Sequence, residues 1–309
     1  MLLLKSVRCR ESVQPDIDSL QLPVVGRCYL NRLPIVLYQP FASAYDAIHN
    51  LLENPRITPA SVRRSALSYT FRLPAEIREL IARLYRLDDV DLAGLERSVA
   101  ASTSAPAGVS ATAAVDAADP PHSSWEGIWQ EPTGLYLVLH DERLSKQRNA
   151  LEAAIIEEAL AAGGELPDRS VGLVTPHRAQ RSLLKSRLTR FIDPNGPIDA
   201  VDTVERFQGG ERPTIIVSAT ASDPSAISAR ARFLLDLNRS NVAFSRAKQR
   251  LIVICSQSLL THIPPEVEHY DSALLWKSLR AFCSRRLFTT TVSGHTVQVF
   301  APPLAAADA

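Results

Sequence analysis

Hydrophobic and polar positions along the second half of the chain form blocks that predict strands and helices in turn. Short, continuously apolar and β-branched runs are typical of buried strands; they span residues 135–140, 171–174, 214–219 and 251–255. Segments with helical patterns separate them, at residues 146–162, about 177–191 and about 241–248. Strands that alternate with helices at this spacing predict an α/β fold, with a mostly parallel sheet and helices on both faces.

Two segments outside this block have patterns of their own. Between about residues 74 and 87, apolar residues recur at spacings of three and four, which predicts one face of a helix; they are Ile77, Leu80, Ile81, Leu84 and Tyr85. Residues 289–300 alternate around a Ser-Gly pair, which predicts a terminal hairpin.

Two stretches lack such a rhythm. The first 60 or so residues are irregular and rich in proline, and residues 98–124 consist mainly of Ala, Ser, Thr, Pro and Asp. A segment of that composition buries too little apolar surface to offset the entropy lost on ordering. We therefore expect residues 98–124 to form a linker or an insertion.

Charge and composition narrow the functional classes. The formal net charge is +1, which does not indicate a generally basic protein that coats nucleic acid. Only five of the 34 basic residues are lysines. Arginine suits bidentate contact with phosphate, although a GC-rich genome would give the same bias, and both interpretations stay open.

Cysteine usage and the absence of long apolar runs bear on location. The four cysteines, at positions 9, 28, 255 and 283, form no CxxC pair, so we predict free thiols rather than a disulfide framework or a zinc site. No run approaches the roughly 18 apolar residues of a membrane span, and the apolar start is too short for a signal peptide. These features predict a soluble, cytoplasmic protein without membrane contact.

The first segment with candidate chemistry is V-G-L-V-T-P-H-R-A-Q, residues 171–180. Thr175 can cap the helix that follows, and Pro176 suits its first position. A helix N-terminus beside His177 and Arg178 is a natural phosphate site. The alternative is a helix that is merely well capped.

The second segment is V-D-T-V-E-R-F-Q-G-G-E-R, residues 201–212, which leads into a strand. Its two glycines allow the backbone to approach a ligand closely. Gln208 and Glu211 can contact phosphate oxygens or ribose hydroxyls. A plain loop is the alternative.

The third segment is D-L-N-R-S-N-V-A-F-S-R-A-K, residues 236–248. If it is helical throughout, Arg239 and Arg246 lie seven apart on one face. An arginine fixed on a helix suits the role of an arginine finger, which stabilises a phosphoryl group in transfer. A solvated basic helix is the alternative.

Together and in this order, the three segments resemble motifs IV, V and VI of superfamily 1 helicases, particularly the Upf-like, senataxin-like 5′-to-3′ branch. That family shows T-P-Y-x-x-Q, V-D-T-V-x-x-[FY]-Q-G-x-E and N-V-A-[LF]-[ST]-R-A-[KR], which here read TPHRAQ, VDTVERFQGGE and NVAFSRAK. Residues 71–77, F-R-L-P-A-E-I, are similar to the family's Y-R-M-H-P-E-I. Residues 18–23, D-S-L-Q-L-P, are similar to motif III, G-D-x-x-Q-L-P-P, with Ile17 in place of the glycine and Val24 in place of the second proline.

The resemblance implies roles for individual residues. ATP, with Mg²⁺, would be bound by Phe71 stacking on the base and by Arg72, Gly209, Glu211, Arg246 and Gln21. Catalytic roles would fall to Arg246 as the arginine finger, to Arg72 and to Gln208. Single-stranded DNA or RNA would be bound by Thr175, Pro176, His177, Thr203 and, as a helper, Arg178. The contacts are to the backbone, so they do not choose between DNA and RNA.

One essential part of such a motor is absent from the sequence. None of the 309 residues forms the P-loop G-x-x-x-x-G-K-[ST], whose amides and lysine cradle phosphates. The pair Asp141-Glu142 follows a strand, but its place after the motif III-like segment puts it in the second motor domain. The resemblance therefore implies a RecA-like three-layer sandwich of the P-loop NTPase superfold without its own P-loop. Such a chain would need a P-loop-containing first motor domain, in the same full-length protein or in a separate chain.

These expectations define segments and competing hypotheses. The segments are a remnant of the first motor domain or irregular lead-in at 1–64, the start of the second RecA-like domain at 65–97, the linker at 98–124, the main body at 125–285 and a tail at 286–309. The favoured hypothesis is the C-terminal motor half of an ATP-dependent helicase, inactive alone. A non-catalytic nucleic-acid-binding or regulatory module is the alternative. A stand-alone metabolic enzyme would leave the ordered motifs unexplained.

Overall fold

The computed structural model describes residues 6–9, 62–65, 69–70, 73–86, 91–94, 124–204, 206–207, 210–264 and 270–304. The chain divides into two compact units, residues 3–67 and residues 68–309, with residues 1–2 grouped with the second. In the first unit, β1 (Ser6–Cys9) pairs antiparallel with β2 (Val62–Ser65). Gln21, the motif III-like segment and residues 98–123 of the expected linker lie outside the described residues, so the predicted segment boundaries stay predictions.

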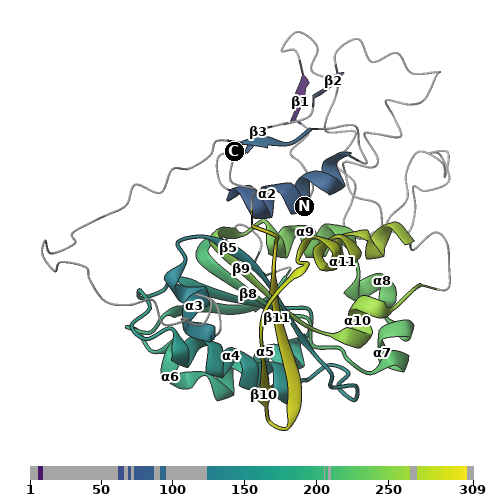
Figure 1. The fold of residues 1–309 in the computed structure, drawn as a ribbon. Helices are drawn as coiled ribbons and strands as arrows, with labels where there is room; N and C mark the ends of the chain where they lie inside the picture. Colours follow the sequence, from purple (N-terminus) through teal and green to yellow (C-terminus); the bar gives the residue numbers. More distant parts are fainter. Residues whose placement is uncertain are drawn as a thin grey trace, which may run out of the picture. The chain divides into compact units, whose positions relative to one another are not determined.

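A seven-stranded sheet forms the centre of the second unit (Figure 1), in the order β10-β11-β5-β9-β8-β6-β7. Its strands are β5 (Gly134–His140), β6 (Val171–Thr175), β7 (Ile198–Thr203), β8 (Arg212–Ser218), β9 (Ala247–Ser256), β10 (Arg285–Val292) and β11 (His295–Ala301). The strands from β5 to β7 are parallel, and the β10–β11 hairpin adds antiparallel beside β5. The hairpin predicted for the tail is present, and it extends the main sheet.

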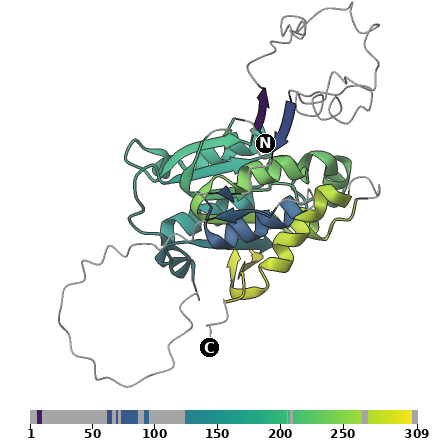
Figure 2. The same cartoon turned by 90° about the horizontal axis from the view of Figure 1, so that it is seen from above.

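Helices cover both faces of this sheet. One face carries α3 (Trp125–Gln130), α4 (Ala150–Ala162), α5 (Arg178–Arg187) and α6 (Thr189–Ile192). The other carries α2 (Ala75–Tyr85), α7 (Pro224–Ala229), α8 (Ala231–Leu234), α9 (Leu237–Phe244), α10 (Gln257–Thr261) and α11 (Tyr270–Phe282). Figure 2 shows α2 and α11 side by side over the sheet. A separate pair of short strands, β3 (Tyr69–Thr70) and β4 (Ala93–Gly94), is parallel.

The central strands β5, β6, β8 and β9 are largely apolar because they are buried on both sides. Along β5, Leu135 and Leu137 join the core under α2 and α11, whereas Tyr136 and Val138 join the core under α4. Two hydrophobic cores therefore sandwich one sheet, and the predicted three-layer α/β fold is confirmed. None of the helices in the described part of the chain has the length and apolar content needed to span a bilayer.

Some predicted boundaries are wrong. The helix expected at 241–248 is α9, which begins at Leu237 because the Asp236 carboxylate accepts the backbone N–H of Arg239 at 2.7 Å. It ends at Phe244, the chain turns, and β9 begins at Ala247. Arg239 and Arg246 therefore do not share one helix face. The helix expected at 177–191 is interrupted at Leu188, which separates α5 from α6.

Candidate functional site

The carboxyl ends of β6 and β7 meet at one edge of the sheet. Thr175 and Thr203 are Cα partners in the parallel register, so the segments that follow them start side by side. A cavity of about 690 Å³ opens there. Its lining residues are Gln147, Pro176, His177, Arg178, Ala179, Arg181, Thr203, Arg206, Phe233 and Arg239. Two separate motifs thus contribute to one cavity.

The local structure at the start of α5 differs from the expectation. The helix begins at Arg178 with His177 as its N-cap, and the His177 side chain makes no capping hydrogen bond. Pro176 therefore precedes the cap rather than taking the first helical position. Thr175 does not cap either, because its fully buried hydroxyl hydrogen-bonds the Thr220 hydroxyl at 2.9 Å. The residues at the start of α5, from Pro176 to Ala179, line the cavity, and the first N–H groups of a helix have no partner within the helix.

The cavity lining is strongly basic. Four of its residues are arginines, and none of the lining residues in the described part of the chain is acidic. Arg178 and Arg206 are exposed. Arg181 pairs with Asp202 at 2.8 Å and donates from Nε to the Val201 carbonyl oxygen at 3.1 Å. Guanidinium groups at a helix N-terminus create an environment suited to an anion.

A stack of three side chains forms one wall of the cavity. The His177 ring lies on the Phe233 ring with centroids 5.6 Å apart and an interplanar angle of 25°. The Arg239 guanidinium carbon lies 4.2 Å from the Phe233 centroid, in cation–π geometry. Burial, and then the charge of Arg230, lower the pKa of His177. Sequence reasoning missed Phe233, since no motif marks it.

Two of the residues predicted to bind nucleotide, Glu211 and Arg246, belong to the described part of the chain, and they lie at the edge of the sheet opposite the cavity. Glu211 immediately precedes β8 and Arg246 immediately precedes β9, at the amino ends of these strands; the first residues of β8 and β9 are Cα partners. The Glu211 carboxylate pairs with Lys248 at 3.1 Å. The half-buried Arg246 accepts the backbone N–H of Arg212 through its carbonyl oxygen at 3.3 Å. Phe71, Arg72, Gln208 and Gly209 lie outside the described residues.

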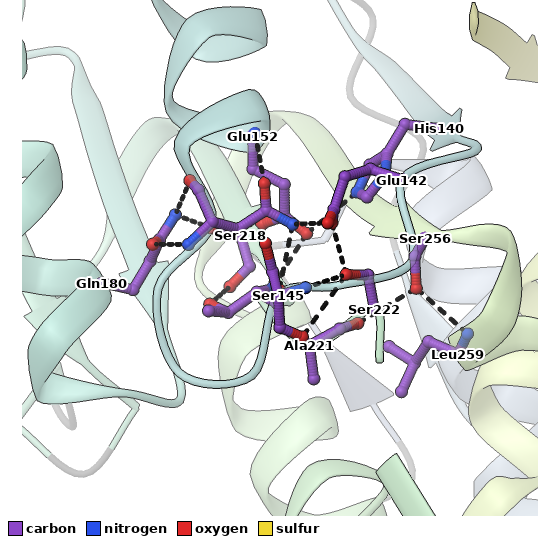
Figure 3. Close-up of polar contacts among 12 residues, drawn as sticks. His140, Glu142, Ser145, Glu152, Gln180, Ser218, Ala221, Ser222, Ser256 and Leu259 are labelled. Carbon is purple, nitrogen blue, oxygen red and sulfur yellow. Dashed lines mark hydrogen bonds and ion pairs between the residues drawn. The ribbon is translucent and has the colours of Figure 1, made fainter. Parts of the chain in front are cut away.

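A buried polar network lies at the carboxyl ends of β5 and β8 (Figure 3). The fully buried Glu152 carboxylate accepts the Ser218 hydroxyl and the Thr220 backbone N–H, the latter at 2.9 Å to both oxygens, and lies 3.3 Å from His140 Nε2. These contacts tie α4 to the ends of β8 and β5. Thr220 is held at a left-handed φ of 72°, which a non-glycine residue adopts only when its surroundings enforce it.

Gln180, the last residue of TPHRAQ, belongs to the same network. Its side chain accepts the Asn149 N–H at 2.7 Å and donates to the Asn149 carbonyl oxygen at 3.0 Å and the Ser218 hydroxyl at 3.1 Å (Figure 3). The motif glutamine therefore fixes α5 against α4 and β8. It positions the cavity-lining residues of α5 and does not itself line the cavity.

The two acidic side chains that follow β5, Asp141 and Glu142, form hydrogen bonds with other protein groups. Asp141 accepts from His295 at 2.8 Å and from the Thr296 N–H at 3.2 Å. Glu142 accepts the Ser222 hydroxyl and the Leu144 N–H. No group of three or more His, Cys, Asp or Glu among the described residues could hold a metal ion.

Comparisons with known proteins match this part of the chain. A family model described as an AAA domain matches residues 129–258. The chain is 29% identical over 152 residues to the DNA replication ATP-dependent helicase/nuclease JHS1 of Arabidopsis thaliana, covering 46% of this chain and 11% of that protein. It is 31% identical over 115 residues to the probable helicase senataxin of Mus musculus, covering 37% and 4%. It is 32% identical over 117 residues to the probable RNA helicase armi of Drosophila melanogaster, covering 37% and 9%.

The alignments thus span only 4–11% of the length of these three relatives. The matched region, residues 129–258, nevertheless contains the whole of the TPHRAQ, VDTVERFQGGE and NVAFSRAK segments. It also contains the five parallel strands and the cavity at the ends of β6 and β7. At residues 129–258 this chain therefore contains the AAA-type domain of a superfamily 1 helicase of the Upf-like, senataxin-like group, in keeping with the C-terminal RecA-like half of that motor.

Proposed function

We propose that this chain is the C-terminal motor half of an ATP-dependent superfamily 1 helicase. The observation that carries the proposal is the cavity at the carboxyl ends of β6 and β7. Four residues chosen from two separate sequence motifs, Pro176, His177, Arg178 and Thr203, line it together. Their neighbours in the lining are arginines rather than acidic residues, which suits a polyanionic ligand.

The ligand proposed for this cavity is the backbone of single-stranded DNA or RNA. Exposed Arg178 and Arg206 can each form bidentate bonds to a phosphate, and the first turn of α5 offers backbone N–H groups to the same oxygens. The printed names of the relatives include both a DNA replication helicase and a probable RNA helicase. Either polymer is therefore a reasonable probe.

The nucleotide would be bound at the opposite edge of the sheet. There Arg246 is proposed as the arginine finger, with Glu211 as a ribose or phosphate contact and with Phe71, Arg72, Gln208, Gly209 and Gln21 completing the set. ATP and Mg²⁺ supply the hydrolysable phosphoanhydride and its charge neutralisation when they are bound. A P-loop-containing first motor domain would hold the metal and the phosphates, because a P-loop supplies the amides, the lysine and the hydroxyl that bind them and these 309 residues contain none.

Nucleic-acid binding tests the proposal directly. We expect this chain to bind labelled single-stranded oligonucleotides of about 15 nucleotides with an affinity that falls steeply as salt rises. The double variant Arg178→Ala/Arg206→Ala should bind at least about tenfold more weakly and lower the salt slope by about two. The control Arg190→Ala/Arg286→Ala removes the same charge from exposed positions on α6 and β10, outside the cavity, and should stay within about twofold of the unchanged chain. Absence of binding at low salt, or equal losses in both variants, would refute the cavity as the site.

A non-catalytic nucleic-acid-binding module is the second candidate. It is favoured by one observation: these 309 residues contain no P-loop, whereas the basic cavity is lined by residues between Gln147 and Arg239. ATP hydrolysis separates the two functions, because the module would bind nucleic acid equally well with and without a P-loop domain and would never stimulate hydrolysis.

A further inference from the structure

His177 is an unusual residue for the wall of a basic cavity. Only 8% of it is exposed, and its Nε2 atom is buried without a hydrogen-bond partner among the described residues. One face of the imidazole is covered by Phe233. A buried polar nitrogen that lacks a partner costs free energy. A ligand that supplied a hydrogen-bond partner to His177 would remove that cost.

The charged groups around His177 are nearly all positive. Arg178 and Arg181 come from α5, Arg206 from the loop after β7, and Arg239 from the start of α9. Arg230, between α7 and α8, acts on the imidazole through its charge. The Asp202 carboxylate lies beside Arg181 and is paired with it.

This environment favours the neutral imidazole over the charged one while the cavity holds no anion. Burial disfavours the charged ring, and Arg230 adds electrostatic repulsion, so the pKa of His177 lies below its ordinary value of 6.5. A phosphate group in the cavity would change the sign of the local field. It would neutralise the arginines and favour an imidazolium that donates a hydrogen bond to it.

We propose that His177 takes up a proton when a phosphate group of the nucleic-acid backbone enters this cavity, so that binding strengthens as the pH falls. The inference rests on the proposed function, because it concerns the same cavity. It adds a property that follows from histidine at this position in particular.

The direction of the pH dependence follows from linkage. The pKa of His177 is higher with the anion bound than without it, so binding takes up protons between the two values. Affinity is constant well above the bound-state pKa, rises as the pH falls through that range, and levels off below the free-state pKa. A difference of one pKa unit corresponds to a tenfold change in affinity.

The test measures binding of labelled oligothymidylate by the whole chain at about pH 7.5, 6.5 and 5.5, at constant ionic strength. Thymine does not titrate in this range, so the probe contributes no proton of its own. We expect affinity to rise about three- to tenfold between the highest and the lowest pH. His177→Phe retains an aromatic ring against Phe233 and removes the titrating group. The affinity of this variant should therefore differ by less than about twofold between the highest and the lowest pH.

Two further variants distinguish the explanations. His177→Gln keeps a hydrogen-bond donor that does not titrate, so its binding should also be independent of pH, and it replaces the phenylalanine variant if that one does not fold. His295→Gln removes a histidine that pairs with Asp141 on the β11 strand, outside the cavity, and should retain the full pH dependence. Binding that is independent of pH in the unchanged chain, or an equal pH dependence in the His177 variants, overturns the proton-uptake inference alone. Absence of binding at every pH overturns the proposed function as well.

Discussion

Glu152 offers the sharpest test of how the cavity edge is held in place. Its carboxylate is fully buried and accepts hydrogen bonds from the Ser218 hydroxyl and the Thr220 N–H. Glu152→Ala removes the acceptor and leaves these donors, together with His140, without it. Glu152→Gln keeps the size and one oxygen. The His140 ring can accept the new amide hydrogen by changing its tautomer, which moves its own proton to Nδ1, a buried atom without a hydrogen-bond partner among the described residues.

The two substitutions should therefore differ in magnitude. Each buried donor left unsatisfied costs about 1–3 kcal/mol, and removing one member of a buried charged network typically costs about 3–5 kcal/mol in all. We expect Glu152→Ala to lower the free energy of unfolding by about 3–5 kcal/mol, partly relieved if water enters the gap. Glu152→Gln loses the charge assistance and leaves the His140 Nδ1 proton without an acceptor, but it keeps an acceptor oxygen and the packing, so it should cost less, about 1–3 kcal/mol.

Urea denaturation followed by circular dichroism measures both values, and thermal melting provides an independent readout. At roughly 2–4 °C per kcal/mol for a domain of this size, the alanine variant should melt about 6–20 °C lower. Glu158→Ala is the matched control, because Glu158 is exposed on the same helix, α4, and should change stability by less than about 0.5 kcal/mol. A Glu152→Ala cost below about 1 kcal/mol, or equal costs for Ala and Gln, would refute the reasoning.

Two further predictions concern the other motifs. A Cβ atom on Gly172 of β6 would lie 2.5 Å from Cζ of Phe207, so Gly172→Ala should cost about 1–3 kcal/mol in urea denaturation; unchanged stability would contradict this close packing. Arg246→Ala, assayed with the P-loop domain that completes the motor, should abolish ATP hydrolysis and leave single-strand affinity within about twofold, because Arg246 lies at the edge of the sheet opposite the cavity. Retained turnover would remove Arg246 from the role of arginine finger, and Arg286→Ala on β10 is its matched control.

The sequence predicts the strands better than the boundaries of the helices. The core strands are visible because burial on both faces makes them continuously apolar, as in β5 and β9. The edge strand β7 escapes prediction because polar Asp199 and Asp202 interrupt it; both carboxylates form ion pairs with arginines distant in sequence. The start of α9 was misplaced because the Asp236 cap outweighs the weak helical pattern that follows it.

The candidate site is predictable where a motif marks it. Four of the five residues predicted to bind nucleic acid line one cavity: Pro176, His177, Arg178 and Thr203. The fifth, Thr175, is fully buried and is not among the lining residues. Phe233 and Arg206 could not be predicted, since Phe233 reaches the cavity only through the tertiary packing of α8 and Arg206 occupies a variable position of its motif. Nor does the motif itself reveal that the Gln180 side chain is directed into the buried network.

The arrangement gives a physical reason why the second and third motifs are long. Thr203 lies at the cavity edge, and Glu211 lies at the opposite edge. Between these two residues in the sequence, Phe207 packs against Gly172 of β6. In parallel, α9 begins near the cavity with Arg239 and the chain reaches Arg246 at the opposite edge. Both motifs therefore connect the proposed nucleic-acid and nucleotide sites over short stretches of sequence.

Such connections are the kind of contiguous packing through which two sites can bias each other. Phe207 packs against Gly172 of β6, the strand between β8 and β7 in the sheet. We expect a displacement of Phe207 to disturb both ends of its loop. We therefore expect Gly172→Ala to weaken single-strand binding and ATP hydrolysis together, in the chain completed by a P-loop domain, at temperatures where the variant is folded. Arg246→Ala acts at one edge only and should change hydrolysis alone. If Gly172→Ala also affected only one activity, the loop would not connect the two sites functionally, and the length of the motif would need another explanation.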